Sequence, residues 1–263
     1  MNHDQPIQLS EPISITLVIP CYNEEFHIEH TLRQITSHLL EYPTFSFQIL
    51  VLDDCSTDSS LVILNQIAKN NPVDITILRN ESNKGIVTST KRLLQTALSL
   101  GPHYILKCDM DTDVPHKMAI SMFLELIEQN RSSKIQILIG ERFVADQNQL
   151  SPLEISEQEK MRVYLMEGLK IKNYNPVSSG TVLFTKNVIE QLLQLPIVIS
   201  YDMKWGLDFL LCLLAHQLNF PVQKVTITNG NYSPSRRSIA KIKAQYAAYY
   251  NVLQLVENCK KLN

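Results

Sequence analysis

The sequence lacks the features that mark secreted, membrane-spanning or nucleic-acid-binding proteins. Its five cysteines are odd in number and contain no C-x-x-C pair, which argues against a disulfide framework or a zinc site and favours a reducing, cytoplasmic compartment. No stretch of 18 uninterrupted apolar residues occurs, and the N-terminal MNHDQPIQLSEP has neither the basic nor the apolar region of a signal peptide. The formal net charge of -2 provides no global attraction to nucleic acid or anionic lipid. Any anion binding must therefore be local.

What the sequence does contain is a regular alternation of apolar strands with helical segments, and its 263 residues fit one domain. Strands are predicted at 13–20, 46–53, 73–80, 103–109, 135–141, 179–185 and 221–228. Helices are predicted near 24–41, 57–70, 85–100, 115–130, 154–171, 205–218 and 238–262. This order is typical of an α/β domain with a mostly parallel central sheet flanked by helices, which binds ligands at the carboxyl edge of its strands.

Three acidic residues follow the fourth predicted strand at alternate positions: Asp109, Asp111 and Asp113 in YILKCDMDTDVP. Bunched carboxylates repel one another beside an apolar core unless a positive charge lies among them. Asp109 and Asp111 could direct oxygens at one Mg²⁺ or Mn²⁺, ions that take one or two carboxylates together with substrate phosphates. The alternative is a solvated acidic loop that caps the helix beginning near Pro115.

Polar clusters also follow the first three predicted strands, at 20–25, 53–60 and 79–85. Each has an ordinary explanation as a helix cap or turn. Capping does not account for Asp53 and Asp54, however, and a carboxylate at a strand end can accept hydrogen bonds from a nucleoside. Gly85 beside Lys84 opens a helix whose N–H groups suit a phosphate. Together with the acidic cluster, these segments favour a site for a phosphorylated nucleoside with a metal ion.

Four segments resemble family 2 glycosyltransferases of the GT-A fold, which use a nucleotide-diphospho-sugar as donor. These segments are LVIPCYNEE (17–25), VLDDCSTDSS (51–60), RNESNKG (79–85) and CDMDTDVP (108–115). Further on, IGERFV (139–144), SGTVLF (179–184) and GLDFLLCLLA (206–215) resemble the branch that contains dolichyl-phosphate and polyprenyl-phosphate sugar transferases. The resemblance covers about residues 13 to 240.

The resemblance implies a single GT-A-like domain over 13–237, after a tail at 1–12 and before an amphipathic C-terminal helix at 238–263. The domain would comprise a nucleotide-binding half and an acceptor half, divided at 114/115.

The resemblance also implies roles for single residues. Pro20, Tyr22 and Glu24 would line the nucleoside pocket, Asp53 or Asp54 would contact the base, and Lys84 and Gly85 would belong to the donor site. Asp109 and Asp111 would hold Mg²⁺ or Mn²⁺ on the donor diphosphate. The resemblance also places Asp111 and Arg142 in catalysis, with Arg142 pairing with phosphate. Apart from the resemblance, the needs of an acceptor make Asp208 a candidate catalytic residue and Arg142, Arg236 and Arg237 candidates to pair with phosphate or the acceptor.

Three departures from the family pattern stand out. Cys55 replaces the usual glycine after the paired aspartates, and Asp113 stands where a glutamine is frequent. The SGTVLF segment lacks the Arg of the family's S-G-F-R-L-F, which bears on the lipid-phosphate acceptor in particular.

The expected activity is a metal-dependent hexosyl transfer, with inversion, from a UDP- or GDP-linked sugar to a polyprenyl or dolichyl phosphate. A sugar hydroxyl in a glycan is the alternative acceptor, and it would need a carboxylate base, for which Asp202 and Asp208 are available. A non-catalytic nucleotide-sugar-binding module is a second alternative. A lipid acceptor would require peripheral membrane contact, which Lys241, Lys243, Lys260 and Lys261 would suit.

Overall fold

The computed structural model describes residues 11–110, 116–130, 136–143, 151–169, 171, 178–228 and 239–260. Of these, residues 116, 141–143, 178–179, 228, 241 and 259–260 are described by their backbone alone.

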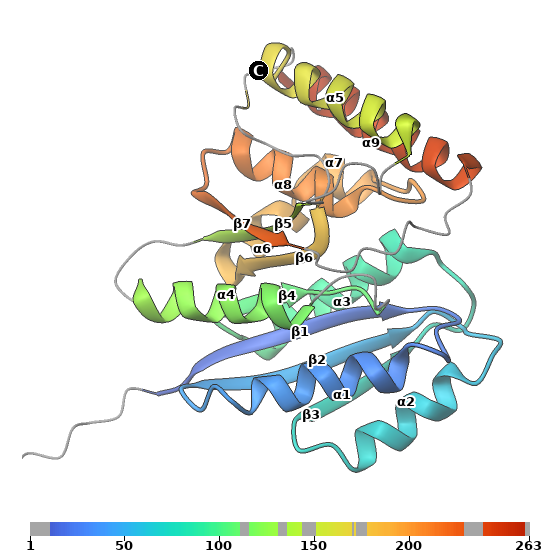
Figure 1. Ribbon diagram of the computed structural model, residues 1–263, viewed down its shortest axis with the longest axis vertical. Helices are drawn as coiled ribbons and strands as arrows, with labels where there is room; N and C mark the ends of the chain where they lie inside the picture. Colours follow the sequence, from blue (N-terminus) through green and yellow to red (C-terminus); the bar gives the residue numbers. More distant parts are fainter. Residues whose placement is uncertain are drawn as a thin grey trace, which may run out of the picture.

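The described strands form one sheet in the order β3-β2-β1-β4-β6-β5-β7 (Figure 1). They are β1 (Ile13–Cys21), β2 (Phe45–Asp53), β3 (Asp74–Arg79), β4 (Tyr104–Lys107), β5 (Ile137–Phe143), β6 (Ser178–Thr185) and β7 (Val222–Thr228). β6 runs antiparallel to β4 and β5, while the other neighbouring pairs among these strands are parallel. The predicted mostly parallel sheet is therefore confirmed, and each predicted strand is present within two residues of its expected bounds.

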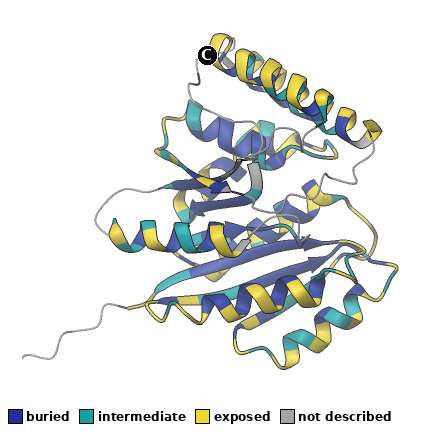
Figure 2. Ribbon diagram, in the orientation of Figure 1, coloured by how far each residue is buried: buried dark blue, intermediate teal, exposed yellow. Residues whose placement is uncertain are grey.

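Helices cover both faces of the sheet. They are α1 (Ile28–Leu39), α2 (Ser60–Lys69), α3 (Ile86–Leu100), α4 (His116–Gln129), α5 (Pro152–Glu167), α6 (Lys186–Leu193), α7 (Pro196–Ser200), α8 (Leu207–Gln217) and α9 (Ile239–Lys260). Because side chains alternate along a strand, Leu17 packs in the core with α1 and α4, whereas Val18 packs in the core with α3, α6 and α8. Figure 2 shows the central strands buried between these two layers.

α6 and α7 were not predicted from the sequence. α6 buries Val188, Ile189, Leu192 and Leu193, whose spacing places them on one side of a short helix. α7 begins with Pro196 in its first turn, where the missing N–H of proline costs no hydrogen bond. Both helices lie in the connection from β6 to α8, for which the sequence predicts neither a helix nor a strand.

α9 lies beside α5 at the end of the molecule farthest from β3 (Figure 1). The hydroxyl of Tyr250 donates to Glu157 at 3.0 Å, and that of Tyr164 donates to Glu257. The predicted amphipathic pattern is partly confirmed: residues such as Ile242 are buried, whereas Ile239 is 65% exposed. Within the described residues, no helix is long and apolar enough to cross a membrane.

Candidate active site

The carboxyl ends of β1, β2 and β4 meet at one edge of the sheet. β1 lies between the other two strands: Cys21 is paired with Asp53 of β2 on one side, and Val18 is paired with Lys107 of β4 on the other. β2 follows β1 in sequence and β4 comes later, so the strand order reverses direction between β1 and β4. Open α/β sheets bind ligands in the crevice at such a point. The structure thus contains the sheet edge that the sequence predicts, and polar loops follow β1 and β2 there.

The loop after β1 is tied to the loop after β2 by reciprocal hydrogen bonds. The backbone N–H of Asn23 donates to Ser56 Oγ at 2.9 Å, and that of Thr57 donates to Asn23 Oδ1 at 2.8 Å. Glu24 N–H donates to Ser60 Oγ at 2.8 Å. These bonds satisfy backbone donors that the ends of the strands leave open. The two loops therefore form a single braced wall.

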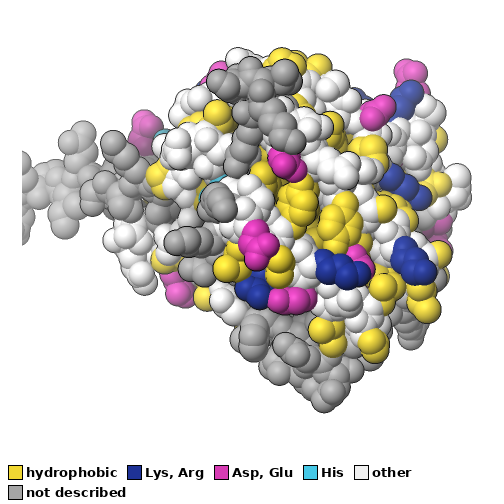
Figure 3. All heavy atoms as spheres, turned by 90° about the horizontal axis from the view of Figure 1, so that it is seen from above, with side chains coloured by type: hydrophobic (Ala, Val, Ile, Leu, Met, Phe, Trp, Pro, Cys, Tyr) yellow, Lys and Arg dark blue, Asp and Glu magenta, His cyan; other side chains and the backbone are white. Residues whose placement is uncertain are grey.

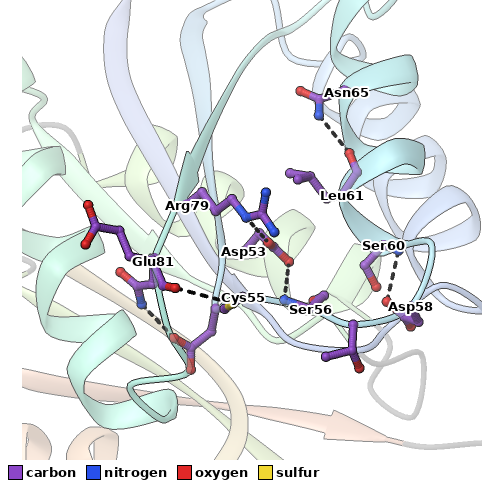
Figure 4. Close-up of polar contacts among 12 residues, drawn as sticks. Asp53, Cys55, Ser56, Asp58, Ser60, Leu61, Asn65, Arg79 and Glu81 are labelled. Carbon is purple, nitrogen blue, oxygen red and sulfur yellow. Dashed lines mark hydrogen bonds and ion pairs between the residues drawn. The ribbon is translucent and has the colours of Figure 1, made fainter.

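Cys55 adopts a conformation that glycine favours. Its φ of 63° lies in the left-handed region, where a side chain costs about 1–3 kcal/mol in backbone strain. This explains why glycine is usual at this position in the family that the sequence resembles. In Figure 4 the Cys55 thiol points to the carbonyl of Glu81, to which it donates at 3.7 Å. The departure noted from the sequence leaves the turn itself intact.

Asp53 and Asp54 are both buried, and each is engaged with the protein. Asp53 accepts a hydrogen bond from Ser56 N–H at 3.2 Å and lies 3.4 Å from Nε of Arg79 (Figure 4). The Oδ1 of Asp54 accepts from Asn80 Nδ2 at 2.6 Å. A base contact by either aspartate, which the resemblance implies, stays a prediction.

The loop before α3 is held by the same carboxylate. Asp54 accepts the backbone N–H of Lys84 and of Gly85, each at 2.8 Å. Gly85 has a φ of 81° and precedes the first residue of α3. Asp54 thus occupies the two N–H groups that directly precede α3. A phosphate at this loop would have to meet other groups, such as the N–H groups of the first turn of α3 or the Lys84 ammonium.

The three residues expected around the nucleoside lie at the end of β1 and just beyond it. Pro20 is buried in the strand, while Tyr22 is 43% exposed. Glu24 contacts His27 Nδ1 at 2.6 Å, and 28% of its side chain is exposed. The side chains of Tyr22 and Glu24 can therefore reach a ligand at this edge. The side chain of Pro20 is buried, so Pro20 could face a ligand only through its backbone.

Asp109 and Asp208, which are 99 positions apart in sequence, share one buried ammonium group. Lys107 Nζ lies 2.5 Å from Asp109 Oδ1 and 2.7 Å from Asp208 Oδ2. The Lys107 side chain is 4% exposed, against 28% for Asp109 and 26% for Asp208. The ammonium thus lies beneath two carboxylates that reach the surface. Both aspartates were predicted as site residues from the sequence, whereas Lys107 was not, although a lysine inside an apolar strand needs a charged partner.

The Lys107 ammonium and the two carboxyl groups around it shift one another's pKa values. Burial alone would lower the pKa of Lys107, but Asp109 and Asp208 outweigh burial and hold the pKa above its ordinary value. Burial raises the pKa of Asp208, and the Lys107 ammonium opposes that rise. Asp208 also lies in the first turn of α8, where the helix dipole favours a negative charge. Lys107 is therefore charged and lies between two carboxyl groups, of which Asp109 is the nearer.

Gly180 of β6 lies directly against Asp109. The antiparallel pairing of Lys107 with Val182, continued by two residues, places position 180 opposite position 109. Gly180 has a φ of 74°, and a Cβ built on it would lie 2.9 Å from the Asp109 Cγ and still closer to Oδ2. A side chain at position 180 would displace the carboxylate, so glycine is required here. No role for this glycine was predicted from the sequence.

The described part of the site fits a hard divalent ion only in part. Asp109 offers a carboxylate oxygen, the ligand type that Mg²⁺ and Mn²⁺ prefer. Among the residues described, no group of three or more His, Cys, Asp or Glu is placed to hold a metal. Asp111 and Asp113 lie outside the described residues. One or two carboxylates completed by substrate phosphates would suffice for such an ion.

The side chains of the expected arginines lie outside the described residues, and the second candidate base lies apart from this cluster. The backbone of Arg142 lies in β5, but its side chain, like Arg236 and Arg237, falls outside the described part. Asp202 is exposed before α8, whereas Asp208 lies within the cluster.

Comparisons with known proteins agree with this architecture. Residues 16–193 match the family described as "Glycosyl transferase family 2". A curated relative, dolichyl-phosphate beta-glucosyltransferase of Dictyostelium discoideum, is 24% identical over 82% of this chain and 66% of its own length.

Two solved structures share the fold. Glucosyl-3-phosphoglycerate synthase from Mycobacterium tuberculosis, solved with phosphoglyceric acid, aligns with a TM-score of 0.64 and 15% identity over 94% of this chain and 80% of that one. A mannosyltransferase from Pyrobaculum calidifontis, solved with GDP-Man and Mn²⁺, aligns with a TM-score of 0.60 and 14% identity over 94% and 70%. The fold is thus that of the GT-A glycosyltransferases, and the chain belongs to glycosyl transferase family 2.

Proposed function

We propose that this protein transfers a sugar from a nucleotide-diphospho-sugar, with a divalent ion held by Asp109 and Asp111, to a polyprenyl or dolichyl phosphate with inversion. The observation that carries the proposal is the position of Asp109. It follows β4 at the reversal point of the sheet, 28% exposed, with Gly180 making room for it. Family membership supports the sugar transfer, and the Dictyostelium relative supports the lipid-phosphate acceptor.

In the proposed reaction, the protein binds the donor at the braced wall after β1 and β2 and holds its diphosphate beside Asp109. When bound, Mg²⁺ or Mn²⁺ supplies positive charge to the diphosphate oxygens as the nucleotide leaves. Tyr22 and Glu24 orient the nucleoside, and Arg142 pairs with phosphate. An acceptor phosphate is already anionic at neutral pH, so the protein needs only to orient it and offset its charge.

A donor screen tests this proposal. The melting temperature should rise by several degrees with one nucleotide-diphospho-sugar among UDP-, GDP- and dTDP-linked donors, and more with Mn²⁺ than without, because a ligand of the folded state stabilises it. Hydrolysis of the same donor should require the metal. Binding without hydrolysis or transfer would favour the non-catalytic module instead, and no shift with any donor would contradict the proposal.

A hydroxyl acceptor remains the second candidate because of where Asp208 lies. Its carboxylate is 26% exposed beside Asp109, as a general base for a hydroxyl would need to be. Asp208→Asn distinguishes the two acceptors. With a phosphate acceptor we expect a loss of at most about tenfold in turnover, whereas loss of a general base would reduce turnover by about 10²–10⁴-fold. Transfer rates with donor and acceptor at saturation provide the measurement, and Asp202→Asn, at the exposed alternative, is the control.

The lipid acceptor also implies peripheral contact with a membrane by a cytoplasmic protein. Of the four lysines expected to serve this contact, Lys243 is exposed on α9, and the side chains of Lys241, Lys260 and Lys261 lie outside the described residues. Figure 3 shows the face that carries α5 and α9, where hydrophobic side chains lie among acidic as well as basic ones. This mixed surface supports a shallow contact better than a purely electrostatic one. The contact is expected only because the acceptor is a lipid. If a phosphate acceptor without a lipid were used, and Asp208→Asn reduced turnover only mildly with it, there would be no reason to expect membrane contact.

A further inference from the structure

The Lys107 ammonium joins the two parts of the site that the proposed function assigns to different substrates. Asp109 follows β4, whose loop would hold the donor, and Asp208 opens α8 in the half expected to bind the acceptor. Both carboxylates contact the same nitrogen, at 2.5 Å and 2.7 Å. Without that charge, two carboxylates so close together would repel each other.

A divalent ion changes this balance. Carboxylates gather around such an ion, and Mg²⁺ or Mn²⁺ held by Asp109 would attract Asp208 as a further ligand unless Asp208 were held elsewhere. The structure shows what holds it. Asp208 Oδ2 accepts a hydrogen bond from the Lys107 ammonium. The Lys107 side chain is only 4% exposed, so water competes little for this bond.

We propose that Lys107 is a positioning residue that keeps Asp208 out of the coordination sphere of the metal ion. Lys107 binds one oxygen of Asp109 and one of Asp208 and so assigns them different tasks: Asp109 holds the metal on the donor, and Asp208 faces the acceptor. This inference rests on the proposed function, in that it takes Asp109 as a metal ligand.

Lys107→Met tests the inference by removing the charge while keeping an unbranched side chain. Mn²⁺ should bind about tenfold more tightly, because a positive charge leaves the neighbourhood of Asp109 and Asp208 becomes free to join it. Turnover should nevertheless fall by at least about tenfold, while the KM for the donor does not rise, because a misplaced carboxylate affects the reacting geometry more than donor binding. A variant that had only lost structure would bind both Mn²⁺ and donor more weakly. Electron paramagnetic resonance of free Mn²⁺ and steady-state kinetics provide the two measurements.

The double variant Lys107→Met with Asp208→Asn separates the two causes of tighter binding. Most of the gain in Mn²⁺ affinity should disappear when position 208 no longer carries a charge. Persistence of the whole gain would overturn the inference, as would weaker or unchanged Mn²⁺ binding in a folded Lys107→Met. Lys91→Met is the matched control: Lys91 donates to the carbonyls of Ile199 and Tyr201 at 3.2 Å and 2.5 Å, away from either carboxylate, and should leave Mn²⁺ affinity unchanged.

Asp208→Asn alone keeps the inference testable if Lys107→Met fails to fold. When Lys107 is present, Asp208 is not a metal ligand, so this variant loses only a neighbouring charge and should bind Mn²⁺ less than about tenfold more weakly than the natural protein. A loss of about tenfold or more would show that Asp208 ligates the metal, which would refute the inference. Failure of the proposed function gives a different result: the natural protein would then either not bind Mn²⁺ at Asp109, so that no variant changes its Mn²⁺ affinity, or bind the donor without transferring sugar.

Discussion

Gly180→Ala should abolish most of the activity while the protein stays folded. The added Cβ would lie 2.9 Å from the Asp109 Cγ and closer still to Oδ2, so the carboxylate must turn away from its place beside Lys107. The φ of 74° adds about 1–3 kcal/mol of backbone strain. Because a displacement of about 1 Å in an active site can reduce turnover by about 10²-fold, we expect a loss of at least that size. Sugar transfer and thermal unfolding of the purified variant measure the two effects.

Gly101→Ala separates strain from steric displacement. Gly101 follows α3 with a φ of 71°, and a Cβ there would meet no atom within 4 Å. This variant should lose about 1 kcal/mol of stability and keep its activity. Equal activity losses in the two variants would show that backbone strain, and not the position of Asp109, explains the effect of Gly180→Ala.

Asp109→Asn should reduce sugar transfer by at least about a hundredfold, since the carboxylate charge that would hold the metal ion is removed while the side-chain size is kept. Excess Mn²⁺ should restore part of the activity, because an amide oxygen binds the ion more weakly than a carboxylate does. Transfer rates across a Mn²⁺ titration provide the measurement.

Asp113→Gln is the control for Asp109→Asn, because glutamine is frequent at that position in the family that the sequence resembles. It removes one negative charge from the same segment and should leave transfer within a few-fold of the natural protein. Activity of Asp109→Asn that is near normal and independent of Mn²⁺ would exclude Asp109 as the metal ligand.

The sheet and the edge that carries its polar clusters could be predicted from the sequence because apolar runs and the clusters that follow them are local signals. Each strand is rich in β-branched or apolar residues, and the clusters at 20–25, 53–60 and 79–85 lie at strand ends as expected. Local signals also gave the amphipathic α9, which packs against α8.

Contacts between distant segments could not be predicted in this way. Lys107 appears in the sequence as a polar residue near a strand end, and its burial becomes visible only when α8 brings Asp208 to it. The need for glycine at position 180 depends on the antiparallel register of β6 against β4. Alternation along β4, which places Ile105, Lys107 and Asp109 on one side, was a signal that could have linked the lysine to the acidic cluster.

Asp54 has a consequence for how tightly a donor can bind. It is a carboxylate that joins the end of β2 to the start of α3 through hydrogen bonds with Asn80, Lys84 and Gly85. Ordering a mobile side chain on association costs about 0.5–1.5 kcal/mol each, and a surface that is already rigid avoids this entropy loss. A nucleotide should therefore meet a preorganised receptor, with fast capture and little rearrangement of the backbone.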